Sequence, residues 1–410
     1  MDRYDTGNRG IQTVIDLAVV SVVLLVTAAL VHPRVSKSIG WRAIVTPLAS
    51  IIGSGFLVIG PILETSFGYL APVAMALLCL VAYAFGAAIR RNILRLEQAP
   101  DRSQAENILD TSASWVLAGA YAISVAYYLN LLGAFSVSLT PYDEPDAARL
   151  VTTATLILIA YVGWTRGFAA LEGMEKFTVT LKLAIIAGLL VGLGVHFGQT
   201  AAAGELLINT PLTTGWPGLA LLFGLIVTVQ GFETSRYLGK EYDAATRVAS
   251  MKRAQWIATA IYMVYIGMLS YVFAAGTIPF SETAIIDLMQ IVAPILPVLL
   301  VGAAIAAQFS AAVADTAGSG GLLSELSKNR IPSRAGYILL AGVGVALTWT
   351  ANVFEIITIA SRAFALYYAL QAAIAALGCW KRAENTKAIS FLGLAVLGLV
   401  IAVAGTAVAV

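Results

Sequence analysis

Long apolar segments recur along the whole chain, and they restrict its possible folds more than any other feature. They lie at 11–31, 42–61, 68–90, 113–138, 149–164, 177–197, 215–238, 250–274, 295–324, 335–351, 353–378 and 387–409. A helix needs about 20 apolar residues to cross a bilayer, and only helices and closed barrels satisfy every backbone polar group there. We therefore predict an all-α polytopic membrane protein with about 12 transmembrane helices. A shorter apolar piece at 283–292 is predicted to form an interfacial or re-entrant helix.

The composition agrees with this prediction. Of the 410 residues, 59% are hydrophobic and 12% are charged, and the mean hydropathy is +0.85, whereas a soluble domain is about 25% charged. No polar block is long enough to fold alone, so residues 1–410 are predicted to form a single membrane domain. The segment 11–31 is interpreted as a retained helix, because Val31-His32-Pro33 is a poor signal-peptide cleavage site.

Basic residues concentrate on one side of the predicted membrane. With the loop after 11–31 placed in the cytoplasm, 20 of the 25 Lys and Arg residues fall on the cytoplasmic side, and only Arg3, Arg9 and Arg149 fall outside. Cytoplasmic loops of membrane proteins carry this excess of positive charge. We expect a multi-pass protein of the cell membrane, which is the plasma membrane in a prokaryote, with both termini outside.

Signals for enzymatic chemistry are missing from the sequence. It contains no Walker loop, no HExxH, no CxxC and no nucleophile elbow. The two cysteines, Cys79 and Cys379, lie in or beside apolar segments, and His32 and His196 stand alone near helix ends. A net charge of +2 gives no indication of nucleic-acid binding. We therefore expect no enzyme, no cofactor, no metal site and no nucleic-acid partner.

The second apolar segment carries a glycine-rich interruption in its middle, Ile52-Gly53-Ser54-Gly55. Each glycine lowers helix propensity by about 1 kcal/mol, so this stretch favours local unwinding. Non-helical backbone at membrane depth persists only where it is buried in protein or lines a cavity, and its freed N–H groups can hold an anionic group. Close helix packing is the alternative explanation, because small residues serve that purpose too.

A second interruption, Gln230-Gly231-Phe232, lies further along the chain. Without the opening helix, the next ten helices divide into two sets of five, 42–197 and 215–378, and each set begins with an interrupted helix. This pattern predicts a 5+5 inverted-repeat core with discontinuous first and sixth core helices, in which substrate binds at the midplane between the breaks. The helices at 11–31 and 387–409 are then additions to the core.

The order of these motifs resembles the amino acid–polyamine–organocation (APC) transporter superfamily, which has the leucine-transporter-type inverted-repeat fold. Ile52-Gly53-Ser54-Gly55-Phe56 is similar to the glycine–serine–glycine signature of the first core helix, and Gln230-Gly231-Phe232-Glu233 resembles the sixth-helix motif. Residues 171–183 are similar to the fifth helix of proton-coupled members and its approach, and 306–332 resemble the eighth core helix. The resemblance covers about 42–378 and implies a transporter.

Four ionisable residues lie inside the predicted core helices: Lys182, Glu233, Asp315 and Arg362. Each costs about 2.5–3.5 kcal/mol at the bilayer centre, so such residues face partners or water. They form either a static network of pairs or a set in which at least one residue changes its protonation during transport. Arg362 could pair with Glu233 or Asp315, or contact an anionic substrate, and the sequence does not choose.

The resemblance implies a specific role for Lys182. Sodium-coupled members of the fold hold a cation between the first and eighth core helices, and in proton-coupled members a fifth-helix lysine occupies that place. Lys182 matches this lysine, with Ser310 and Asp315 as its expected neighbours. Glu233 matches a glutamate that is thought to couple protonation to substrate release in some exchangers. A hydrogen bond to the broken backbone is the alternative for Glu233.

Three polar residues share one face of the third core helix. Tyr121, Ser124 and Tyr128 recur at i, i+3 and i+7, which makes them candidates for lining a polar cavity. Packing or interface anchoring is the alternative for such aromatic residues.

The expected function is secondary active transport of an amino acid or a related amine or organocation by alternating access. The expected coupling is to protons and not to sodium, and the expected partners are a small-molecule substrate, protons and the lipid bilayer. One alternative is a non-transporting sensor or scaffold with the same fold. The other is a transporter of a different small solute, such as a nucleobase or potassium.

Overall fold

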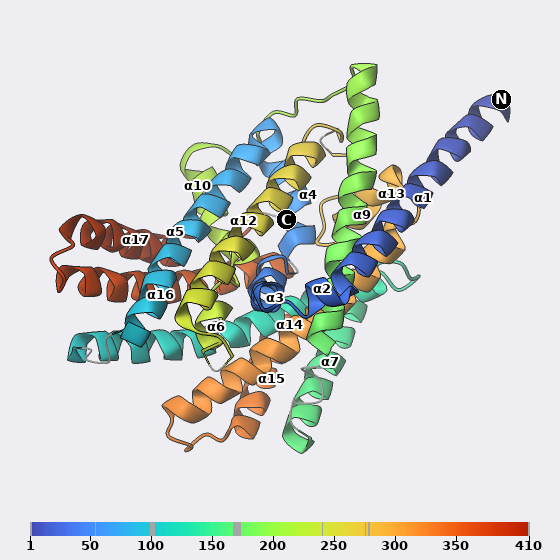
Figure 1. Cartoon of the computed structure of the whole chain (residues 1–410). Helices are drawn as coiled ribbons and strands as arrows, with labels where there is room; N and C mark the ends of the chain where they lie inside the picture. The colour runs from blue at the N-terminus through green and yellow to red at the C-terminus, as the bar shows by residue number, and fades with distance from the viewer. Residues whose placement is uncertain are drawn as a thin grey trace.

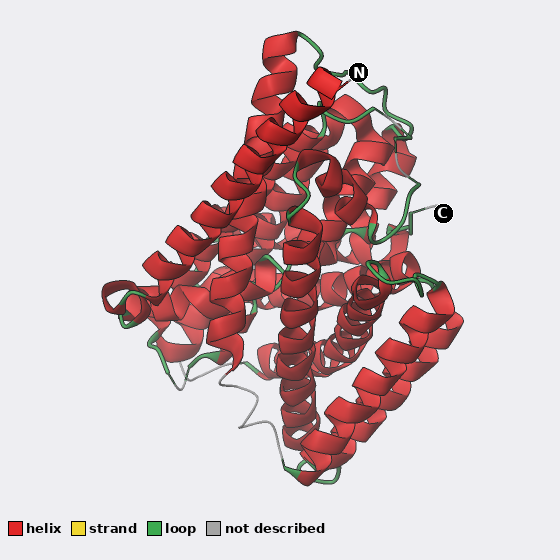
Figure 2. Ribbon diagram, turned by 90° about the vertical axis from the view of Figure 1, so that its right-hand side faces the viewer, coloured by secondary structure: helices red, strands yellow, loops and turns green. Residues whose placement is uncertain are grey.

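The computed structural model describes residues 2–53, 55–98, 103–166, 174–239, 241–274, 276–277 and 279–408. Within these ranges every regular element is a helix, and the helices gather into one bundle (Figures 1 and 2). The prediction of an all-α protein is therefore confirmed for the described residues.

The helices follow the chain in a fixed order, with two short 3₁₀ helices labelled η. They are α1 (Asp2–Val31), α2 (Pro33–Ser36), α3 (Ile39–Ile51), α4 (Gly55–Phe67), η1 (Gly68–Leu70), α5 (Ala71–Gln98), α6 (Gln104–Val137), α7 (Pro145–Thr165), α9 (Met174–Ala203), α10 (Gly215–Gly224), η2 (Ile226–Val229), α11 (Thr234–Tyr237), α12 (Ala244–Leu269), α13 (Ala284–Val292), α14 (Leu296–Leu326), α15 (Ser333–Thr350), α16 (Val353–Trp380) and α17 (Asn385–Ala404).

Helical structure occupies each apolar range predicted from the sequence, and the short helix predicted at 283–292 is α13. Within the described ranges, eight helical segments are long and apolar enough to cross a membrane, namely α1, α4 together with α5, α6, α7, α9, α14, α16 and α17. The architecture of a helical membrane protein is thus supported. The total of 12 crossings and the 5+5 repeat remain predictions.

Two long helices, α14 and α16, each pack against a third, α6, in the interior of the bundle. Their contact surfaces are deeply buried: Val125 and Leu129 of α6 and Phe364 of α16 have no exposed area. Truncation of Phe364 to alanine alone would lower the free energy of unfolding by about 3–5 kcal/mol. Helix α16 also contacts α10 and η2, so the second interrupted segment lies against this interior.

Helix α1 is the least buried of the candidate membrane spans, and it packs against α9 at an angle, so that its N-terminal end diverges from α9 (Figure 1). Gly188 and Gly192 of α9 make this approach possible, because a β-carbon on Gly188 would come within 2.7 Å of Val23 and one on Gly192 within 3.2 Å of Val19. Small residues four apart are a common basis for close helix packing in membranes. That α1 is an addition to the core remains a prediction.

Helix α17 folds back along α16, and the residues after it turn into the bundle. The backbone N–H of Thr406 donates to the carbonyl of Ala220 at 2.9 Å, so segment 405–408 is attached to α10. At the same point Gly224 has no room for a β-carbon, which would lie 2.0 Å from the carbonyl oxygen of Thr406.

Candidate functional site

The first interruption separates α3 from α4. Helix α3 ends at Ile51, Ile52 leaves the helical region with φ −85° and ψ 61°, and α4 begins at Gly55. Ser54, predicted as part of the substrate site, lies outside the described residues. The predicted break at Ile52-Gly53 is therefore present in the backbone.

The second interruption follows α10 and is longer than the sequence indicated. The α-helical geometry already ends at Gly224, η2 continues the chain, and Gln230 is extended with ψ −179°. Gly231 has φ +113°, a conformation that side-chain-bearing residues rarely adopt. Ser361 of α16 supplies hydrogen bonds to the unwound chain, because its hydroxyl accepts from the N–H of Val227 at 3.1 Å and donates to the carbonyl of Gly224 at 2.7 Å.

The two interruptions lie directly against each other. A β-carbon on Gly55 would be 2.7 Å from the Cα atom of Thr228, and one on Gly231 would be 2.4 Å from the Oγ atom of Ser50. The hydroxyl of Tyr262, on α12, donates to Ile51 O at 3.1 Å and to Thr228 O at 2.7 Å. The single hydroxyl proton of Tyr262 is thus shared between a carbonyl at each break, in a setting where unsatisfied backbone groups are costly.

Glu233 is hydrogen-bonded to the second break. Its Oε2 atom accepts from the N–H of Gly231 at 3.0 Å and from the hydroxyl of Tyr368 at 2.8 Å. Tyr368 also lies 3.3 Å from the Oε1 atom of Gln230, whose amide nitrogen is 3.5 Å from the hydroxyl of Tyr128. The structure therefore shows the hydrogen-bonded arrangement that the sequence left as one of two interpretations for Glu233.

The predicted polar face of α6 points into the same interior. Tyr121, Ser124 and Tyr128 are all buried, and the hydroxyl of Ser124 is hydrogen-bonded to the carboxylate of Asp315 on α14. Phe232, at the second break, stacks on Tyr368 with ring centroids 5.1 Å apart. Side chains from α6, α14 and α16 thus meet around the second break.

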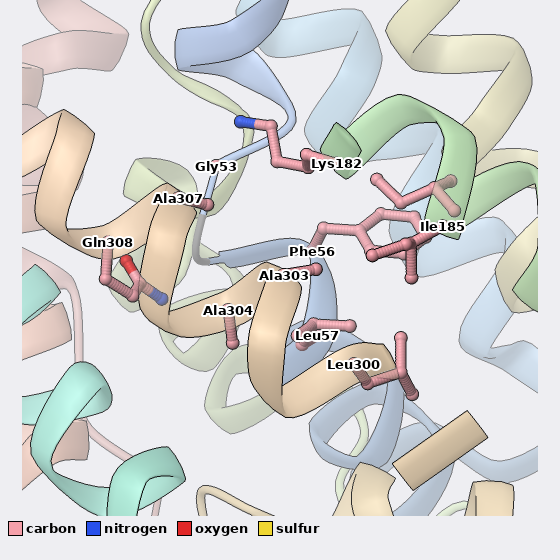
Figure 3. A pocket seen from close by; sticks show the side chains of 11 residues that line it. Gly53, Phe56, Leu57, Lys182, Ile185, Leu300, Ala303, Ala304, Ala307 and Gln308 are labelled. Atoms are coloured by element: carbon pink, nitrogen blue, oxygen red, sulfur yellow. The ribbon is translucent and has the colours of Figure 1, made fainter. Parts of the chain in front are cut away.

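Lys182 lies at the first break. Its side chain is 7% exposed, and its Nζ atom donates to the carbonyl of Ala49, near the end of α3, at 2.7 Å. A cavity of about 20 Å³ opens beside it, between α4, α9 and α14, and Figure 3 shows Gly53 and Gln308 among its lining residues. That volume is about the size of one water molecule.

Ser310 and Asp315, the expected neighbours of Lys182, both lie on α14. The hydroxyl of Ser124 is hydrogen-bonded to Asp315, and Ser310 is half-buried.

Arg362 is exposed on α16, where its guanidinium donates to the carbonyls of Ala402 and Val403 at 2.7 and 2.9 Å. Arg362 therefore binds the carboxyl end of α17, and these two contacts do not involve either of the carboxylates considered from the sequence.

Sequence reasoning missed three residues of this region. Tyr262 and Tyr368 are fully buried tyrosines whose hydroxyls bind the broken backbone or Glu233. Gln308 of α14 has no exposed area, and within the described residues neither its Oε1 nor its Nε2 atom has a hydrogen-bond partner. A polar side chain in an otherwise apolar membrane segment was the available signal in each case.

Comparisons with known proteins extend over this whole region. A family model described as an APC superfamily transporter matches residues 33–405. An uncharacterized protein of Aquifex aeolicus (strain VF5) is 40% identical over 387 residues, which cover 92% of this chain and 94% of that protein. The matched range includes both interruptions and all the residues that surround them.

Proposed function

This chain belongs to the APC superfamily of transporters, and from that premise we propose that it is a secondary active transporter of an amino acid or a related amine. We propose further that transport is coupled to protons, is independent of sodium, and proceeds by alternating access of a site between the two interruptions. The contact of Lys182 with the first interruption is the observation that carries this proposal.

Lys182 provides a cation that is covalently attached to α9. Its ammonium donates to the Ala49 carbonyl at 2.7 Å, beside the cavity that Gly53 and Gln308 line. Carbonyl oxygens at the end of an interrupted helix are the type of ligand that binds a coupling cation in transporters. An ammonium in this position takes the place of a free metal cation, and unlike the metal it can lose its charge by releasing a proton.

The proposed substrate site lies between the breaks. Helix α4 begins at Gly55, where Thr228 of the second break packs closely. Helix N-termini bind anionic groups such as a carboxylate. The second break contributes Gln230 and Phe232, and Tyr128 is within 3.5 Å of Gln230. Because Tyr262 holds both breaks, movement of one broken helix would be transmitted to the other.

The proposal is tested with purified protein in proteoliposomes. Amino acids, polyamines, nucleobases and potassium are first screened for thermal stabilisation of the protein in detergent, and the stabilising solute is then used for uptake. We expect uptake to be the same in sodium and in choline buffer and to change several-fold with pH. Lys182→Ala should remove the pH response, because it removes the ammonium that donates to Ala49, whereas the exposed control Lys252→Ala should keep it.

Two results would contradict the proposal. One is uptake that requires a sodium gradient, and the other is an unchanged pH profile in Lys182→Ala. A solute that stabilises the protein but is never taken up would favour the sensor or scaffold alternative instead.

A further inference from the structure

A buried carboxylate at the end of α4 plays no part in the site described above. Glu64 is 7% exposed, and it lies nine residues beyond Gly55, which is about 13 Å along the helix. Its Oε1 atom accepts from the amide of Asn209 at 2.8 Å, and its Oε2 atom lies 3.4 Å from the hydroxyl of Thr65. Both of these partners are neutral, so neither compensates the charge of the carboxylate.

The surroundings hold Glu64 in place. Asn209 belongs to the linker between α9 and α10, and its amide also donates to the carbonyl of Phe273 at 2.8 Å. The same linker is attached to the end of α4, because the N–H groups of Leu212 and Thr213 donate to the carbonyl of Ser66 at 3.1 and 3.0 Å. The carboxylate is therefore fixed between the first broken helix and the linker that precedes the second one.

Two adjoining cavities open at this point and share Thr65 and Phe280 in their walls. The smaller, of about 20 Å³, is lined by Glu64 itself. The larger, of about 440 Å³, lies between the end of α4, the start of α10 and segment 405–408. Its walls combine hydroxyl groups with apolar side chains: Thr65, Ser66, Thr213 and Thr406 with Leu212, Pro217, Leu221, Phe280, Ala407 and Val408.

We propose that these cavities form a second binding site, in which Glu64 receives the ammonium group of an amine while the larger cavity holds its apolar part. The chemistry supports a cationic ligand, because an ammonium would supply the charge that the neutral partners Asn209 and Thr65 do not. The volume is in the range of small-molecule sites. The inference deepens the proposed function: an amine substrate would bind here, about 13 Å from the first break, before it reaches the site between the breaks.

The site is tested on the full chain in detergent with a simple amine. Binding of n-butylammonium is measured by equilibrium dialysis, with n-butanol and butyrate as the uncharged and anionic probes of similar size. We expect n-butylammonium to bind to the wild type in preference to both. Glu64→Gln should weaken its binding at least about tenfold, since a charged hydrogen bond is replaced by a neutral one. Glu205→Gln, an exposed residue of the same linker, should leave it unchanged.

A second variant tests the larger cavity independently of the charge. Thr213→Trp places an indole in the 440 Å³ space, while the backbone N–H of this residue can still donate to Ser66. It should abolish butylammonium binding in protein that elutes as a folded monodisperse species. Equal affinity of the wild type and Glu64→Gln, or equal affinity for the three probes, would overturn the inference.

These outcomes are separable from the failure of the proposed function. If Glu64→Gln keeps full butylammonium affinity while the wild type transports its substrate in a pH-dependent manner, the second site is wrong and the transporter stands. If the amine binds through Glu64 but no solute is taken up, the second site stands and the transport proposal is wrong.

Discussion

At the scale of single residues, this interior satisfies its polar groups with few exceptions. Glu233 accepts from Gly231 and Tyr368, and the hydroxyl of Ser361 serves both a donor and an acceptor of the unwound chain. Such groups in a low-dielectric interior are stable only when hydrogen-bonded. Gln308 is different, because its buried amide has no partner among the described residues. Gln308 also lines the water-sized cavity beside Lys182, so a bridging water or a ligand group placed there would satisfy this amide.

We expect Gln308→Met to separate stability from activity. Methionine has nearly the same shape and no groups to satisfy, so the free energy of unfolding should rise by about 1–3 kcal/mol. Uptake should fall, because the amide can no longer bind its ligand or a bridging water. The control is Gln371→Met, which removes an amide already bonded to Asn92 at 2.9 Å and should lower stability. Thermal unfolding in detergent and uptake in proteoliposomes measure the two effects. A loss of stability in Gln308→Met would show that the amide is already paired in the resting protein.

At the scale of helices, apolar length and glycine placement predicted most of what the structure contains. The ranges of the long helices were predictable, because bilayer thickness sets the length of an apolar helix. The two interruptions were predictable, because glycine weakens a helix where it occurs. The contacts between side chains of different helices were not predictable from the sequence. The hydrogen bonds of Lys182 to Ala49, of Asp315 to Ser124 and of Arg362 to the end of α17 are examples. A sequence gives the face of a helix on which a residue lies but not the rotation and height of the neighbouring helix.

The contact between the two interruptions depends on Tyr262 in a way that can be measured. Tyr262→Phe should lower the free energy of unfolding by about 1–3 kcal/mol, because the carbonyls of Ile51 and Thr228 lose the hydroxyl that they share. Tyr265 is a matched control on the same helix: its ring also packs on Phe56, with centroids 4.5 Å apart, but its buried hydroxyl has no described partner. Tyr265→Phe should therefore be neutral or slightly stabilising.

Thermal unfolding of the two variants side by side in one detergent gives the comparison. If both variants lose the same stability, the effect belongs to the tyrosine rings and not to the hydroxyl that joins the breaks. We also expect Tyr262→Phe to slow uptake, since the two broken helices would no longer be held by one side chain.

At the scale of the whole molecule, orientation in the membrane is set by charge and not by packing. The bundle would have the same internal contacts in either orientation, but the excess of Lys and Arg on alternate loops favours one of them. The proposed second site depends on this orientation. Glu64 lies at the end of α4 that the charge distribution places outside, so the proposed second site would face an amine that approaches from outside.

The orientation is open to a direct test, because the chain has few reactive thiols of its own. Cys79 and Cys379 are free but buried, so an impermeant maleimide added to intact cells should leave them unmodified. We introduce Asn107→Cys near the start of α6 and Tyr142→Cys in the loop before α7, both at exposed positions. Tyr142→Cys should be labelled from outside, and Asn107→Cys should react only after the membrane is permeabilised, because the charge distribution places it in the cytoplasm. Both should react fully in detergent, which controls for burial. The reverse pattern would invert the bundle, place Glu64 on the cytoplasmic side, and turn the second site from one that receives an amine into one that releases it.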